Sequence, residues 1–179
     1  MPYVYTGSWD LADDECLLLE MTVPPVPRYW GIQTASPLYA TLDHVHRHSS
    51  LTRAQTVADD DGKVRVILAH RDPGVPNWLD TLGHRQGILM FRIAKPAEPR
   101  ISTQRLADTS IDWFASVAPG AAAPAVKPRS VLIPPPRCEV LKFAHLREAL
   151  PANSPTVSAQ ARRAAIDRRF AQINRLIRS

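Results

Sequence analysis

Three histidines, His44, His46 and His48, alternate with other residues along the chain. In an extended strand they would share one face, because successive side chains point to opposite sides. Neutral imidazoles at that spacing could bind a transition metal, and His70 or His84 could complete the ligand set. The alternative is that they are partly exposed loop residues, which we favour because no other metal-ligand motif accompanies them. We therefore expect no metal and no other cofactor, and keep a metal-assisted enzyme as an alternative function.

A second ionisable group lies directly after a predicted strand. His70, Arg71 and Asp72 could serve as a base, an anion holder and an orienting acid. The alternative is a structural turn, in which Asp72 accepts backbone donors, Arg71 pairs with a carboxylate and Pro73–Gly74 shapes the bend. We favour the turn, because Pro fixes its φ angle and Gly permits positive φ, and together they suit a sharp bend.

The same stretch ends in Asn77 and Trp78. We expect Asn77 to hydrogen-bond to the backbone and Trp78 to fill the core, as a rigidly held turn requires. Such a turn could also present polar groups to a ligand. The candidate binding residues are therefore His44, His46, His48, His70, Arg71, Asp72, Asn77 and Trp78.

Several catalytic motifs are missing from the sequence. It contains no G-x-S-x-G elbow, no Walker loop and no G-x-G-x-x-G, so nucleotide-dependent chemistry is not expected. Cys16 and Cys138 are far apart and form no metal-binding pair. The sequence leaves open whether the chain is an enzyme.

Short apolar or alternating runs predict four β-strands, over residues 15–23, 28–35, 63–69 and 86–94. In the second run, Trp30, Ile32 and Thr34 share one face. Asp59–Gly62 predicts a tight turn that pairs residues 54–57 with 63–69 as a hairpin. Strands at this spacing, without regular intervening helices, predict a mainly β fold, an antiparallel jelly-roll-like β-sandwich followed by a C-terminal amphipathic α-helix.

Composition divides the chain into three parts. We expect a β-sandwich domain over 1–117, a proline-rich linker or wrapping arm over 118–153, and a basic amphipathic helix over 154–179. Within the arm, residues 137–150 predict a short helix. Ser154 and Pro155 suit the N-cap and the first position of the last helix. The apolar stripe of that helix comprises Val157, Ala161, Ala165 or Ile166, Phe170, Ile173 and Ile177.

The formal net charge is +5. Residues 158–179 hold six arginines and one acid, Asp167, so this segment carries the whole excess. We expect the helix to pack its apolar stripe on its own body or on a second subunit, with its arginines in water. The alternative is binding to an anionic surface through Arg162, Arg163, Arg168 and Arg169. Nucleic acid binding by the main domain is not expected.

The N-terminus has no basic region followed by an apolar run, so it does not predict a signal peptide. No apolar run approaches the ~20 residues that span a bilayer. A cytoplasmic protein without a membrane span is the simplest expectation.

An ordered set of motifs resembles one protein family. It comprises Leu42–Arg47, Asp61–Gly62, His70–Gly74, Asn77–Leu79 and Phe91–Arg92, preceded by Tyr29–Trp30. The set is similar to the family called domain of unknown function 1214, over about residues 10–95, and is most like its actinobacterial branch. One departure is Asp80, where the wider family more often has Pro. The resemblance implies a jelly-roll sandwich that usually forms the C-terminal part of a longer protein, and it supplies no catalytic residues.

These features together predict a noncatalytic module that binds a ligand or a partner, or has a structural role. Its expected partners are a second copy of the chain, through the C-terminal helix, or a separate front domain.

Overall fold

The computed structural model describes residues 3–22, 29–94 and 136–178. The chain divides into two units, of which the first comprises residues 1–95 and 134–179 and the second residues 96–133. All the described residues belong to the first unit. The predicted boundary between residues 117 and 118 lies outside them.

The described part of the chain contains eight strands. Their bounds are β1 (Tyr3–Asp10), β2 (Glu15–Thr22), β3 (Tyr29–Ala35), β4 (Ser50–Thr52), β5 (Lys63–Ala69), β6 (Trp78–Asp80), β7 (Gln86–Ala94) and β8 (Arg137–Lys142). The helical elements are η1 (Arg53–Gln55), η3 (Phe143–His145), α2 (Leu146–Ala149) and α3 (Ala159–Arg178).

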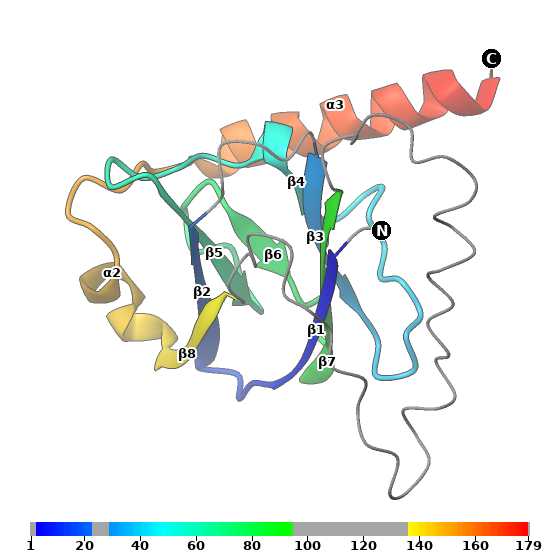
Figure 1. Cartoon of the computed structure of the whole chain (residues 1–179). Helices are drawn as coiled ribbons and strands as arrows, with labels where there is room; N and C mark the ends of the chain where they lie inside the picture. Colours follow the sequence, from blue (N-terminus) through cyan, green and yellow to red (C-terminus); the bar gives the residue numbers. More distant parts are fainter. Residues whose placement is uncertain (1–2, 23–28, 95–135, 179) are drawn as a thin grey trace, which may run out of the picture. The chain divides into compact units, whose positions relative to one another are not determined.

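The strands form two four-stranded sheets that face each other (Figure 1). The β7 sheet has the order β1-β7-β3-β4, and the β5 sheet has the order β6-β5-β2-β8. The mainly β sandwich with a C-terminal helix is therefore confirmed. One pair differs from the expected antiparallel arrangement, because β6 runs parallel to β5. The parallel pairing involves only the last three residues of β5. The loop over residues 70–77 therefore needs to run back along only these three residues before β6 begins.

The core lies between the sheets and follows the alternation of the strands. Trp30, Ile32 and Thr34 of β3 are all buried, as their shared face predicted. Trp30 packs edge-on against Phe91 of β7, with ring centroids 5.6 Å apart. From the other sheet, alternate residues of β2 and β5 are buried on the same side, including the paired Leu19 and Val66. Apolar burial between the sheets is the main source of stability.

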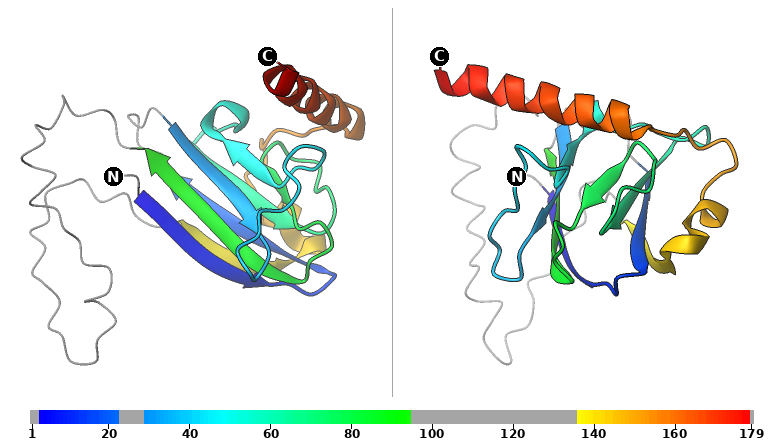
Figure 2. Two further views of the ribbon diagram at one scale, coloured as in Figure 1. Left: turned by 90° about the vertical axis from the view of Figure 1, so that its right-hand side faces the viewer. Right: turned by 180° about the vertical axis from the view of Figure 1, so that it is seen from behind.

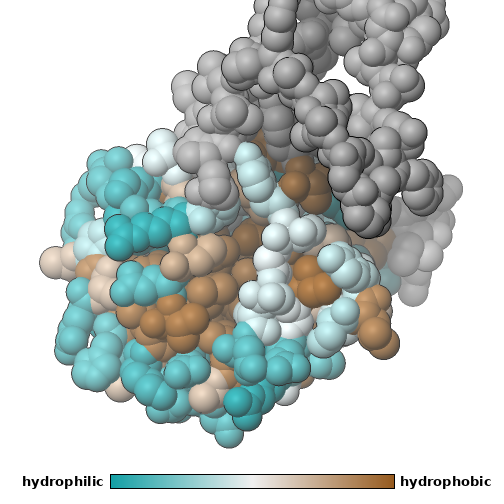
Figure 3. Space-filling view, turned by 60° about the horizontal axis from the view of Figure 1, so that its bottom comes forward, coloured by the Kyte–Doolittle hydropathy of each residue, from teal (hydrophilic) through white to brown (hydrophobic). Residues whose placement is uncertain are grey.

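A second apolar cluster covers the outer face of the β5 sheet. Cys16 and Leu18 of β2 pack with Leu146 and Leu150 from the α2 region. Trp78 belongs to the same cluster. Apolar residues also gather at the surface on the end away from α3, where hydrophilic residues surround them (Figure 3).

Two predictions of local structure needed correction. The expected hairpin is wrong, because residues 53–55 form η1 and β5 pairs instead with β2 and β6. The turn itself is present, since the Gly62 amide donates to the Asp59 carbonyl and Gly62 has φ +76°. The sequence predicted a helix over 137–150, but residues 137–142 form β8, and only η3 and α2 in that range are helical.

Helix α3 lies across one end of the sandwich, and its last turns extend past the sheets (Figure 2). Its twenty residues span about 30 Å at 1.5 Å per residue. The cap differs from the prediction: Ser158, not Ser154, accepts the first backbone donor, from Ala161. Ser154 instead donates to Asp59. Within the described residues, no helix is both long and apolar enough to cross a membrane.

Candidate functional site

The loop between β5 and β6 is a rigid turn held by its own polar side chains. Asp72 accepts the Gly74 amide at 2.9 Å, as the turn hypothesis predicted, and Gly74 has φ +71°, which favours glycine. Asn77 is buried and donates to the carbonyls of Val57 and Arg65, at 2.7 and 2.9 Å. These bonds replace strand pairing and fix the start of β6.

Trp78 and His48 stack side by side at the end of this turn. Their rings are nearly parallel, with centroids 6.0 Å apart, and both residues are buried. The Trp78 indole donates to the Ala69 carbonyl at 3.1 Å. The Nδ1 of His48 lies 2.6 Å from the Trp78 carbonyl. Because a carbonyl only accepts, Nδ1 carries the proton and Nε2 presents a lone pair.

His48 is held neutral at physiological pH. Burial lowers its pKa from 6.5 to about 4, and the nearby guanidiniums of Arg162 and Arg169 act in the same direction. The hydrogen bond to the Trp78 carbonyl and the charge of Asp72 partly oppose this shift. Two guanidiniums and one carboxylate thus act on the imidazole, in addition to its burial.

Arg162 attaches the first half of α3 to the turn. Its side chain is buried and bonds to both carboxylate oxygens of Asp72, at 3.0 and 3.2 Å. It also donates to the carbonyls of Pro76, at 2.9 Å, and Val75. The guanidinium carbon lies 5.3 Å from the Trp78 ring centroid. The sequence placed this arginine in water, and that prediction is wrong.

Arg169 attaches the second half of α3, seven residues further along. It donates to the carbonyls of His44, Arg47 and Ser50, at 3.1, 3.2 and 2.8 Å. No carboxylate in the described ranges pairs with it. Burial lowers the pKa of its guanidinium below the ordinary value. Arg169 thus adds a positive charge that its surroundings do not neutralise.

A groove of about 410 Å³ lies beside these two attachments, between α3 and the body. Its polar lining residues are His48, Gln55, Arg162, Arg168, Arg169 and Gln172. Ala161 and Ala165 of the helix and Pro76 of the turn supply apolar surface. None of the described residues that line it is acidic. Such a concave site, part apolar and part cationic, suits a small anion with an apolar body.

The loop that carries the histidines is held in place by a buried acid. Asp80 accepts two hydrogen bonds from Arg47, at 2.8 and 2.6 Å, and one from the Leu82 amide, at 2.8 Å. Asp80 is almost fully buried, while half of the Arg47 side chain is exposed. This ion pair joins the loop to β6 and so positions His48 at the groove.

The three clustered histidines do not converge, because residues 43–49 form a bend rather than a strand. His44 is exposed, and His46 lies against Phe170, with ring centroids 5.0 Å apart, and 3.2 Å from Asp43. Only His48 points into the protein. In the described ranges, no group of three or more histidine, cysteine or acidic side chains is placed to hold a metal ion.

The second predicted group is also divided. His70 bonds to the Thr81 hydroxyl at 2.7 Å and lies 3.3 Å from the Leu11 carbonyl. Arg71 lies over the Phe143 ring at 4.2 Å, instead of pairing with a carboxylate as expected. Of these three residues, only Asp72 contacts the groove lining, through its hydrogen bonds to Arg162. The structure therefore brings together His48, Asp72 and Trp78 of the predicted residues.

Sequence reasoning missed the roles of Arg162 and Arg169 in the site. One signal was available: with Ile166 and Ile173, they occupy one row of a helix at spacings of three or four residues. An arginine within an apolar row is a candidate for burial against a partner. The identity of that partner, Asp72, ninety residues away, was not readable.

Comparisons with known proteins support the family resemblance. Residues 12–98 match the family model described as "Protein of unknown function (DUF1214)". The crystal structure of an uncharacterised protein from Burkholderia cenocepacia is similar, with a TM-score of 0.57 and 27% identity over 80% of this chain and 30% of that chain. The VPA0106 protein from Vibrio parahaemolyticus gives 0.44 and 14%, over 53% and 26%. No curated protein matches. The chain thus spans less than a third of the Burkholderia protein.

Proposed function

We propose that this chain, with its DUF1214 segment, is a noncatalytic module that binds a small organic anion in the groove beneath α3. The observation that carries the proposal is the lining of the groove, which holds three arginines, a neutral histidine and two glutamines, but no acid. Apolar surface from the alanines of α3 favours a carboxylate with a short apolar body over a bare inorganic ion.

Charge balance supports an anion. The charge of Arg162 is matched by Asp72, so this residue mainly fixes the helix. Arg169 has only carbonyl partners, and Arg168 is exposed with no ion pair among the described residues. The two remaining cations face a site that is partly shielded from water, where a carboxylate gains more than it would at an open surface.

The chemistry of the lining favours binding over catalysis. Among the described lining residues, His48 is the one titratable base, and its pKa of about 4 makes it a poor proton acceptor at neutral pH. The lining residues that the structure describes supply no hydroxyl, thiol or carboxylate to act as a nucleophile. Recognition of a ligand needs none of these groups.

The test is calorimetric titration of the full chain with benzoate, a short alkanoate and inorganic phosphate as separate probes. We expect a carboxylate to bind, and Ala165→Leu to abolish binding by filling the groove. Ala164→Leu is the matched control, because Ala164 neighbours Ala165 but does not line the groove. Binding should also raise the pKa of His48, measured by NMR, since an anion stabilises the imidazolium. Equal binding to both variants would refute the groove as the site, and preference for phosphate would refute the organic ligand.

A further inference from the structure

We propose that the outward face of α3 binds an acidic helical segment of a partner protein. This face adjoins the groove at Arg168, which also lines the groove, and its other members lie outside the groove lining. It is the row Ala164, Arg168, Ala171 and Arg175, whose members recur every three or four residues. We refer to these four residues as the outward row.

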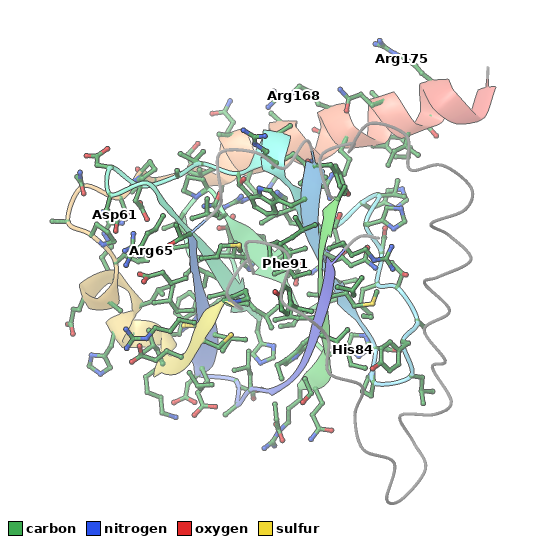
Figure 4. The ribbon with its side chains drawn as sticks, viewed as in Figure 1. Asp61, Arg65, His84, Phe91, Arg168 and Arg175 are labelled. Carbon is green, nitrogen blue, oxygen red and sulfur yellow. The ribbon has the colours of Figure 1, made fainter. Side chains whose placement is uncertain are left out.

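The charge of the outward row is unmatched. Arg168 and Arg175 are exposed and have no ion pair or hydrogen bond within residues 3–22, 29–94 and 136–178. Arg175 points away from the body, and Arg168 lies at the edge of the groove on the side away from the sheets (Figure 4). The single acid of this segment, Asp167, is exposed on the neighbouring side of the helix. Because Arg162 and Arg169 are already used by the body, the cations that remain for a partner lie mostly along this row.

The spacing of the row fits a helix. Arg168 and Arg175 are seven residues apart, about 10.5 Å along the axis. Ala164 and Ala171 occupy the positions between and before them, and their small side chains allow a second helix axis to approach closely. A partner helix with acids at seven-residue intervals would present carboxylates at the same separation. The alternation of small and cationic residues therefore favours a helix over an irregular chain.

Other occupants fit less well. A second copy of α3 would place arginines against arginines, and like charges across an interface oppose association. A phosphate backbone or an anionic lipid surface attracts arginines whatever lies between them, so it gives no reason for alanines in the gaps. An acidic helix uses both features of the row at once.

The test uses the full chain and a labelled helical peptide of about three heptads, with Glu at seven-residue intervals and Ala beside it. Fluorescence anisotropy at about 0.15 M salt measures binding. We expect Arg175→Glu to weaken binding about tenfold, because reversal replaces attraction with repulsion. Arg163→Glu makes the same charge change outside the row and should weaken binding less than about threefold.

Four results would overturn the proposal. These are equal effects of Arg175→Glu and Arg163→Glu, equal binding of a peptide with the same residues in scrambled order, tighter binding of a DNA duplex or phosphatidylserine vesicles, and self-association of the chain that Arg175→Glu abolishes. Arg175 does not line the groove, so ligand binding there should be unchanged by Arg175→Glu, and failure of one proposal leaves the other intact.

Discussion

The two attachments of α3 use the same residue type in different ways. Arg162 is buried against a carboxylate, two carbonyls and an indole ring, so its charge is neutralised where it lies. Arg169 meets three carbonyls of the histidine loop and no acid in the described ranges. The Arg162 attachment therefore mainly holds the helix, whereas the Arg169 attachment also adds positive charge to the groove.

His48 lies near both attachments, so its pKa responds to the charges of both. Its pKa is lowered by Arg162 and Arg169 but raised by Asp72, which pairs with Arg162 only. The Arg162–Asp72 pair therefore acts on His48 with opposing effects, and the charge of Arg169 acts without such opposition. Changes at the two attachments should thus be separable by stability and by the titration of a single imidazole.

The largest expected effect is the loss of the first attachment. Arg162→Met should reduce the free energy of unfolding by about 3 kcal/mol, because it leaves Asp72 and two carbonyls without their shared partner. Urea unfolding followed by circular dichroism measures this change. Arg163→Met, at an exposed neighbouring position, should stay within about 0.5 kcal/mol of the parent. A loss at Arg162 no greater than at Arg163 would show that the buried ion pair does not hold the helix.

The second effect is a dependence of stability on pH. The folded pKa of His48, about 4, lies below its ordinary value of 6.5, so the unfolded chain binds the proton more readily between these limits. Stability should therefore be complete above about pH 6.5 and fall as the pH drops toward 4, by about 3 kcal/mol at 1.36 kcal/mol per pKa unit. Unfolding free energies across this range, compared with His48→Gln, measure it.

Another titrating group, Asp61, should affect stability only at lower pH than His48 does. Asp61 has its pKa lowered to about 2 by Arg65, so its contribution is lost mainly below about pH 4. The pair lies on the outer face of the β5 sheet (Figure 4). An unchanged slope between pH 4 and 6.5 in His48→Gln would assign the dependence to other groups.

Alternation along a strand was readable from the sequence where one face is buried. Residues 29–35 and 86–94 carry that pattern, and both strands were predicted. The short strands β4 and β6 were not predicted. Each contains three residues, which are too few for an alternating pattern to be recognised. β8 is almost wholly exposed and so shows no alternation. Its position depends on pairing with β2, more than a hundred residues away.

The site was readable only in part for a related reason. Asn77 bonds to backbone carbonyls and Trp78 is buried, as the turn predicted, but the carbonyls that Asn77 binds lie 12 and 20 residues away and were not predicted. Arg162 is buried against a carboxylate ninety residues away, and Arg47 of the histidine loop pairs with the distant Asp80. Such long-range charge pairs leave no period or motif in the sequence.

The smallest expected effect on stability is that of removing the Arg169 attachment, which differs most clearly from the Arg162 attachment in its effect on the pKa of His48. Arg169→Met should cost no more than about 1 kcal/mol, because the carbonyls it leaves belong to an exposed or half-exposed loop and can bond to water. It should raise the pKa of His48, since one lowering charge is removed. Asp72→Asn should do the opposite and lower the pKa of His48 further, because it removes the charge that opposes the arginines.

NMR titration of the His48 ring in the two variants measures both shifts. The two variants should also change carboxylate binding in opposite directions. Arg169→Met should weaken it about tenfold by removing an unmatched cation, and Asp72→Asn should strengthen it by freeing the charge of Arg162. Because a general loss of structure would weaken binding in both variants, only opposite signs support the division of roles. Shifts of His48 in the same direction would mean that Arg169 does not set the charge of the groove.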